Sequence, residues 1–105
     1  MNYRQRKRKR KQERLPCNIT VMINDSLACE AFDIGEGGMY MLTDQPFKLG
    51  TILKISLFYG DEKIEIQSKV KYCHKGVGIG IMFIDLDNEL KDKIKGFINN
   101  IKQLT

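Results

Sequence analysis

Long hydrophobic runs are missing from this chain. None of its apolar stretches approaches the roughly 20 residues that a helix needs to span a bilayer. The N-terminus is charged but lacks the apolar core of a secretory signal peptide. These two absences predict a soluble protein that works in the cytoplasm and inserts no segment into a membrane.

Cysteine and histidine are also scarce. The chain has three cysteines, Cys17, Cys29 and Cys73, and one histidine, His74. An odd number of widely spaced cysteines fits neither a disulfide framework nor a zinc site. Neighbouring strand residues point to opposite faces, so Cys73 and His74 are poorly placed to share a metal or to act as nucleophile and base. We therefore predict no metal, no cofactor and no enzymatic activity.

Positive charge is concentrated at one end of the chain. Residues 1–14 hold eight Lys or Arg and a single Glu, a net charge of +7, and they show no apolar periodicity. Residues 15–105 hold ten Lys or Arg and twelve Asp or Glu, a net charge of −2, so the +5 of the whole chain comes from its start. We predict a flexible basic arm over residues 1–14 and one folded domain over residues 15–105.

Alternation of apolar and polar residues predicts six β-strands in the folded part. The expected strand segments are residues 17–23, 27–34, 39–44, 52–59, 63–73 and 77–86. The alternation places Phe32, Tyr72 and Val77 among the side chains that face the core. Gly78 and Gly80 fall on the other face of the last strand, where glycine permits coiling or close approach of another group.

After the sixth strand the apolar period lengthens to three or four residues. This spacing predicts an amphipathic helix over about residues 87–104, capped by Asp87 or Asn88. Six short antiparallel strands joined by tight turns favour a barrel, because closure removes exposed strand edges. The predicted fold is therefore all-β: a six-stranded antiparallel β-barrel with a C-terminal α-helix and a flexible basic N-terminal arm.

Two short motifs carry most of the functional signal. Asp33, Gly35 and Gly38 form a D-x-G-x-x-G pattern between two strands, where glycine lets a ligand approach the backbone closely. In the arm, Arg10 and Arg14 form an R-x-x-x-R pattern, and arginine matches phosphate oxygens and the O6/N7 edge of guanine. Neither motif alone identifies a ligand, since a turn that bonds its own backbone and a solvated basic tail fit equally well.

The order of these features resembles the PilZ domain family, whose members are bacterial receptors for cyclic di-GMP. The segment "RKQER" leads into the first strand, "DIGEGG" ends the second, and a barrel and a helix follow. The resemblance implies that Arg10 and Arg14 hold phosphate and the Hoogsteen edge of guanine, and that Asp33 bonds its N1 and N2 edge. It implies that the Gly35–Gly38 turn, with Gly37, packs against the base or the ligand backbone.

The resemblance also implies a mode of action. Cyclic di-GMP, as one molecule or an intercalated pair, binds between arm and barrel, and charge-assisted bonds offset the entropy lost when the arm orders. The ordered arm then presents a new surface to an effector protein in motility or biofilm regulation. Arg6 and Arg8 are further candidate contacts, and Arg6 with Arg10 offers an alternative register of the arm motif.

One position departs from the family signature, (D/N)-x-S-x-x-G. Gly35 occupies the serine position, so a hydroxyl that would bond the ligand is missing. One such hydrogen bond contributes about 0.5–1.5 kcal/mol, which corresponds to roughly tenfold weaker binding. The same departure supports an alternative, a degenerate PilZ domain that binds no nucleotide and serves as a protein–protein adaptor.

Binding of single-stranded nucleic acid is a second alternative, because basic arms bind phosphate backbones. Tyr40, Phe58, Tyr59 and Tyr72 are candidate stacking surfaces for bases. The folded part carries −2, however, and alternation explains most of these rings as packing residues. Nucleic acid is thus the less favoured ligand, and an arm without an apolar face is not expected to insert into a membrane.

Overall fold

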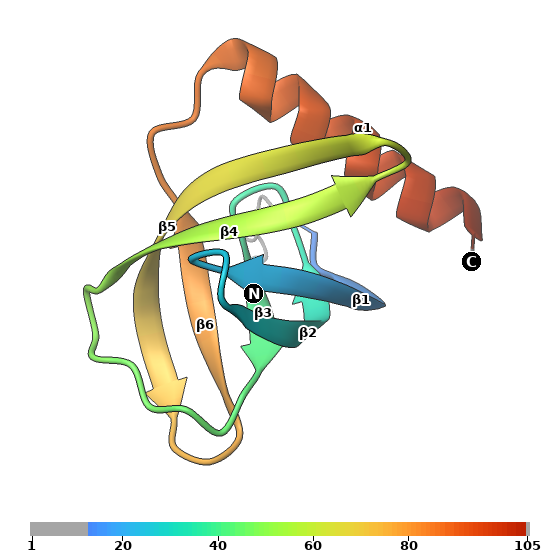
Figure 1. Cartoon of the computed structure of the whole chain (residues 1–105). Helices are drawn as coiled ribbons and strands as arrows, with labels where there is room; N and C mark the ends of the chain where they lie inside the picture. Colours follow the sequence, from blue (N-terminus) through green and yellow to red (C-terminus); the bar gives the residue numbers. More distant parts are fainter. Residues whose placement is uncertain (1–12, 105) are drawn as a thin grey trace, which may run out of the picture.

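A computed structural model describes residues 13–104, which fold into a barrel and one helix (Figure 1). The elements are β1 (Leu15–Ile23), β2 (Leu27–Ile34), β3 (Gly38–Leu42), β4 (Ile52–Tyr59), β5 (Glu62–His74), β6 (Gly78–Phe83) and α1 (Asn88–Leu104). The predicted fold class, a six-stranded antiparallel barrel with a C-terminal helix, is confirmed. Only Glu13 and Arg14 of the predicted arm fall within the described residues. Over this range no helix is long and apolar enough to cross a bilayer.

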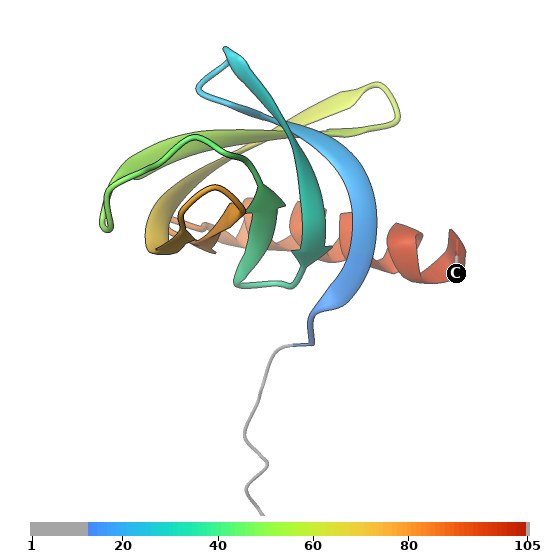
Figure 2. The same ribbon diagram turned by 90° about the horizontal axis from the view of Figure 1, so that it is seen from below.

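The barrel closes through a short pairing of its first and fourth strands. The order around it is β1-β2-β3-β6-β5-β4, and every neighbouring pair is antiparallel. The closing contact pairs Met22 with Ser56 and Ile23 with Ile55. Closure leaves each strand with two neighbours, so the sheet has no free edge to protect. Figure 2 shows β1 curving along one side of the barrel.

Aliphatic side chains from all six strands fill the barrel. Val21, Ile55, Ile66 and Ile81 are buried at its centre. In β1, β2 and much of β5, buried or half-buried side chains alternate with more exposed ones, which is the period of two that the sequence shows. In β4 and β6 several consecutive residues are buried, so the core follows the predicted alternation in only part of the barrel.

Two β-bulges break that alternation and overturn two predictions. The register of β2 against β3 shifts between Ala31 and Asp33, and that of β5 against β6 shifts between Val70 and Tyr72. A bulge adds one residue to one strand and re-aims the side chains beyond it. Phe32 and Tyr72, expected in the core, instead lie exposed on the outer face of the barrel.

Val77 was also expected to face the core, and that prediction is wrong. It lies in the turn before β6 rather than in the strand, and its side chain is exposed. The turn is closed by a hydrogen bond from the N–H of Val77 to the carbonyl of His74, at 2.9 Å. β6 therefore begins one residue later than the alternation suggested.

The helix packs on the barrel through one apolar stripe. Ile94, Phe97, Ile98 and Ile101 are buried, as the three- and four-residue spacing predicts. Asp87 caps the helix, because its Oδ1 accepts from the N–H of Leu90 at 2.8 Å. Figure 1 shows α1 crossing the end of the β4–β5 hairpin.

Two contacts hold α1 at that hairpin. The ring of Phe97 meets that of Tyr59 edge-on, with centroids 5.8 Å apart. Nζ of Lys93 on α1 forms an ion pair, at 2.8 Å, with Glu62, the first residue of β5. The helix is thus fixed to the barrel by packing and by charge.

Candidate ligand-binding site

The turn between β2 and β3 is pinned on both sides. The N–H of Gly35 donates to the carbonyl of Gly38 at 2.8 Å, which closes the turn. The N–H of Phe83 donates to the carbonyl of Gly37 at 2.9 Å and ties the turn to the end of β6. The glycine turn is therefore a fixed part of the barrel rim.

Arg14 and Asp33, predicted together as site residues, are in direct contact. Nη1 of Arg14 lies 2.5 Å from Oδ1 of Asp33, and the two side chains are 33% and 25% exposed. The same Oδ1 accepts from the N–H of Tyr40 at 3.2 Å, which holds the carboxylate in place. Arg10, Arg6 and Arg8 lie outside the described residues. The described part of the site is thus a partly exposed ion pair anchored to β3.

Gly35 lets the start of the arm lie against the turn. A Cβ at this position would be 2.6 Å from the carbonyl oxygen of Glu13 and 3.1 Å from Cδ of Arg14. Real Cβ atoms do not approach an oxygen so closely, so any side chain here requires the arm backbone to move. We had expected the missing serine to remove only a hydroxyl. The glycine also makes room for Glu13 and Arg14.

Glu13 connects the arm to the helix. Its carboxylate Oε1 forms an ion pair with Nζ of Lys102, 3.1 Å away, near the C-terminal end of α1. Its backbone carbonyl meanwhile lies over Gly35. We call Glu13 and Arg14 the arm root, since together they contact the turn, β2 and α1.

Gly38 is glycine for a packing reason. It is buried, and a Cβ there would collide with the carbonyl of Ile81 on β6. Gly38 pairs with Met82 in the β3–β6 ladder, so the collision is between neighbouring strands. Gly38 therefore lets the end of the turn pack closely against β6. Gly37 is only half-buried.

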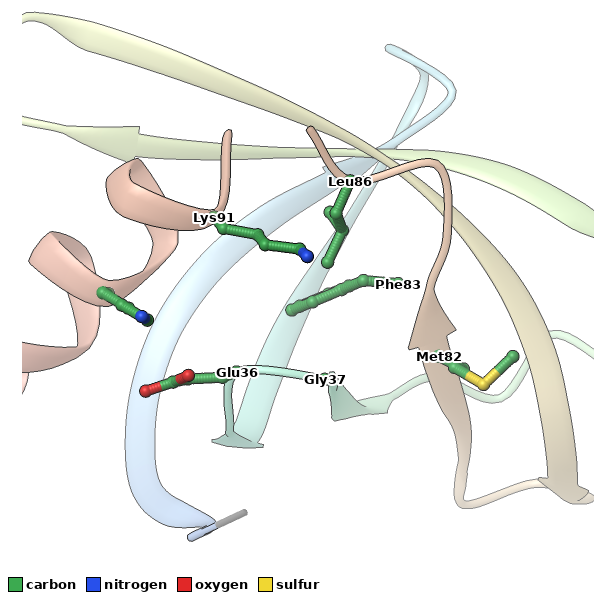
Figure 3. A pocket seen from close by; sticks show the side chains of 7 residues that line it. Glu36, Gly37, Met82, Phe83, Leu86 and Lys91 are labelled. Carbon is green, nitrogen blue, oxygen red and sulfur yellow. The ribbon is translucent and has the colours of Figure 1, made fainter. Parts of the chain in front are cut away.

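A pocket of about 450 Å³ lies on the helix side of the same turn (Figure 3). It is lined by Glu36, Gly37, Met82, Phe83, Leu86, Lys91 and Lys95. In Figure 3 the side chains of Glu36 and Lys91 extend into the space between the turn and α1. Sequence reasoning missed both lysines, because on the polar face of a helix they give no signal that distinguishes them from solvated residues.

Aromatic rings gather on the outer face of the barrel beside Asp33. Tyr40 stacks on Tyr72 with centroids 6.1 Å apart and meets Phe32 edge-on at 6.4 Å. His74 lies 5.8 Å from the Tyr40 ring, and its Nδ1 is 2.8 Å from the Tyr40 hydroxyl. We had interpreted most of these aromatics as packing residues. The two bulges that expose Phe32 and Tyr72 leave no mark in the alternation.

The thiol of Cys17 lies close to the site but is expected to be unreactive. Burial, followed by the nearby Asp33 carboxylate, raises its pKa from 9.0 to about 11. Its Sγ donates to the carbonyl of Ala31 at 3.5 Å. A thiol with so high a pKa is almost fully protonated at neutral pH and is a poor nucleophile. Residues 13–104 also hold no group of three or more His, Cys, Asp or Glu side chains placed to bind a metal.

Comparisons with known proteins identify the family and show a shared fold. A family model for the PilZ domain matches residues 6–100. The chain is similar to the crystal structure of the PilZ domain of CeSA from a cellulose-synthesizing bacterium, with 21% identity, a TM-score of 0.69, and coverage of 86% of this chain and 98% of that one. It is also similar to YcgR from Escherichia coli, solved in complex with c-di-GMP, with 10% identity, a TM-score of 0.72, and coverage of 90% and 46%. A search of curated proteins finds no match.

Proposed function

The chain belongs to the PilZ domain family, a family of cyclic di-GMP receptors, and we propose that it binds cyclic di-GMP between the arm and the β2–β3 turn. The observation that carries the proposal is the contact of Arg14 with Asp33 beside the glycine turn. These two side chains offer a cation for phosphate or the O6/N7 edge of guanine, and a carboxylate for its N–H groups. In this account Arg10, four residues before Arg14, adds a second guanidinium, and Arg6 and Arg8 are further candidates.

The Arg14–Asp33 pair is suited to exchange with a ligand. An exposed ion pair contributes only about 0–1 kcal/mol to stability, so opening it costs little. A dianionic dinucleotide replaces it with charge-assisted hydrogen bonds to both partners. Asp33 keeps its orientation during the exchange, because the N–H of Tyr40 still holds the carboxylate.

The arm root supplies a route for the signal. Since Glu13 contacts both Gly35 and Lys102, movement of the arm toward the ligand alters a contact with α1. We propose that this rearrangement changes the surface presented to an effector protein. The protein then acts as a cytoplasmic receptor and not as an enzyme, with motility or biofilm formation as the class of output.

A protein–protein adaptor that binds no nucleotide is the second candidate. The observation that favours it is the arm backbone packed over Gly35, where the family signature has serine. Single-stranded nucleic acid is less favoured, since residues 15–105 carry a net charge of −2.

The test is calorimetric titration of the whole chain with cyclic di-GMP at about 150 mM salt, with GTP and a short oligonucleotide as controls. Saturable binding of cyclic di-GMP alone supports the proposal. Absence of heat with the dinucleotide favours the adaptor, and binding of the oligonucleotide alone favours the nucleic-acid arm.

A further inference from the structure

The aromatic shelf, defined as Phe32, Tyr40, Tyr72 and His74, has no role in the site outlined above. It spans four adjacent strands, because β2, β3, β6 and β5 are consecutive in the barrel. Phe32 is 56% exposed and Tyr72 is 43% exposed, so the rings are not core residues that reach the surface only at an edge. Such a cluster on the outside of a small barrel requires an explanation.

The shelf is built by glycines beneath it. A Cβ on Gly80 would collide with three ring atoms of Tyr72, and one on Gly78 would lie 2.8 Å from Cε2 of Tyr40. Both rings therefore lie over the glycine backbone of β6. Covering a glycine strand is itself a structural use of the rings. It occupies the side of the rings that meets the sheet, and the exposure of Tyr72 shows that the ring surface away from the sheet is open.

The shelf is continuous with the Arg14–Asp33 pair. Phe32 is the residue before Asp33. Tyr40 pairs with Asp33 in the β2–β3 ladder, and its N–H donates to the Asp33 carboxylate. The bulge in β2 places Phe32 and Asp33 outside the barrel between the buried Ala31 and Ile34. Bulges next to binding sites commonly re-aim side chains in this way.

We propose that the aromatic shelf is the stacking surface for a guanine base of cyclic di-GMP. The inference rests on the proposed function. Asp33 binds the edge of a purine, and a flat apolar surface beside that carboxylate fits the face of the same or the second base. Aromatic side chains stack on any base, because every base has a π-face. The hydrogen bond between the Tyr40 hydroxyl and His74 fixes one ring of the shelf before the ligand arrives.

A nucleotide fits this surface better than an apolar protein segment. The edge of the shelf carries the ionic groups that a nucleotide needs, a guanidinium and a carboxylate 2.5 Å apart. An apolar protein segment offers no charged or hydrogen-bonding group to this guanidinium and carboxylate. A protein partner is therefore not the occupant we favour.

The test compares affinities for cyclic di-GMP in four variants of the whole chain. Tyr72→Ala and Phe32→Ala are each expected to weaken binding about tenfold, within the range for loss of one base stack. Tyr72→Phe keeps the ring and is expected to stay within about twofold of the unmodified chain. Phe58→Ala is the matched control: Phe58 is 54% exposed and pairs with Lys63, at the opposite end of β5 from Tyr72 and His74.

A fifth variant moves the ring without deleting it. Gly80→Ala adds a Cβ whose nearest neighbours are all Tyr72 ring atoms, so it displaces that ring and is expected to weaken binding as Tyr72→Ala does. Circular dichroism and thermal melting check that each variant folds. If the unmodified chain binds and the Tyr72→Ala and Phe32→Ala variants bind equally well, the shelf proposal is wrong and the receptor proposal stands. If the unmodified chain does not bind, both are wrong.

Discussion

Arg14 and Asp33 stand 19 positions apart in the chain, yet Nη1 of the first lies 2.5 Å from Oδ1 of the second. The two side chains that we propose as ligand contacts are thus paired with each other. The pair holds the arm root on the turn, and the same root reaches Lys102 on α1. In the proposed account, this contact links occupation of the site to the position of the arm root.

Restoring the family serine at position 35 is expected to weaken binding of cyclic di-GMP. Any Cβ there lies 2.6 Å from the Glu13 carbonyl oxygen, so the arm root must move away from Asp33. Gly35→Ala adds the Cβ alone and is expected to weaken binding several-fold. Gly35→Ser adds a hydroxyl that recovers part of this loss, since one hydrogen bond contributes about 0.5–1.5 kcal/mol. Calorimetry on both variants checks this, and tighter binding by Gly35→Ser than by the unmodified chain would contradict the steric argument.

Cys17 is expected to resist alkylation. With a pKa of about 11 in place of 9.0, its thiolate is scarcer at pH 8 by roughly two orders of magnitude. Mass spectrometry of iodoacetamide-treated protein, folded and in denaturant, measures the difference. Asp33→Asn removes one cause of the raised pKa and is expected to speed the reaction. Equal rates in the folded and unfolded chain would show that the thiol is not shielded.

The same pKa predicts how stability changes at alkaline pH. The thiol ionises near pH 9.0 in the unfolded chain but only near 11 in the folded one. Raising the pH through this range removes protons from the unfolded state first and favours it. The free energy of unfolding is therefore expected to fall from about pH 9 to about 11, and Cys17→Ser is expected to make the decline shallower. Urea titrations at several pH values test this.

Ser56 is expected to be better replaced by alanine. It is fully buried on β4, and its Oγ has no hydrogen-bond partner among residues 13–104. A buried hydroxyl without a partner costs on the order of 1 kcal/mol, so Ser56→Ala raises the free energy of unfolding by about that amount. Ser68 is the matched control, since its Oγ bonds the Ile66 carbonyl at 3.5 Å and Ser68→Ala gains nothing. A lower urea midpoint for Ser56→Ala than for the unmodified chain would refute the argument.

The strands and the helix were predictable because burial imposes a period on the sequence. Ile64 and Ile66 alternate with polar neighbours, and Ile94 and Phe97 recur at helical spacing. The closed barrel was predictable because six antiparallel strands joined by tight turns favour closure, which removes exposed strand edges. These features depend on many residues at once, so single exceptions do not obscure them.

The faces of Phe32 and Tyr72 were not predictable in the same way. Phe32 lies in the bulge of β2 and Tyr72 follows the bulge of β5, and one extra residue in a strand changes the faces of the side chains at and beyond it. Arg14 and Asp33 were predicted to contact the same ligand, but their direct contact with each other was not predicted. The close packing of Glu13 on Gly35 was not predicted either, because it depends on backbone atoms that no residue type identifies.

The most direct test of the account is a double-mutant cycle on Arg14 and Asp33, read by calorimetric titration with cyclic di-GMP. Arg14→Ala and Asp33→Asn are each expected to weaken binding at least about tenfold, and the double variant less than the product of the two, because the groups act on one ligand. Asp25→Asn is the control, since Asp25 forms a comparable 2.5 Å pair with Lys54 that lies outside the site. Binding unaffected by either single change, or weakened equally by Asp25→Asn, would contradict a site shared between the arm and the turn.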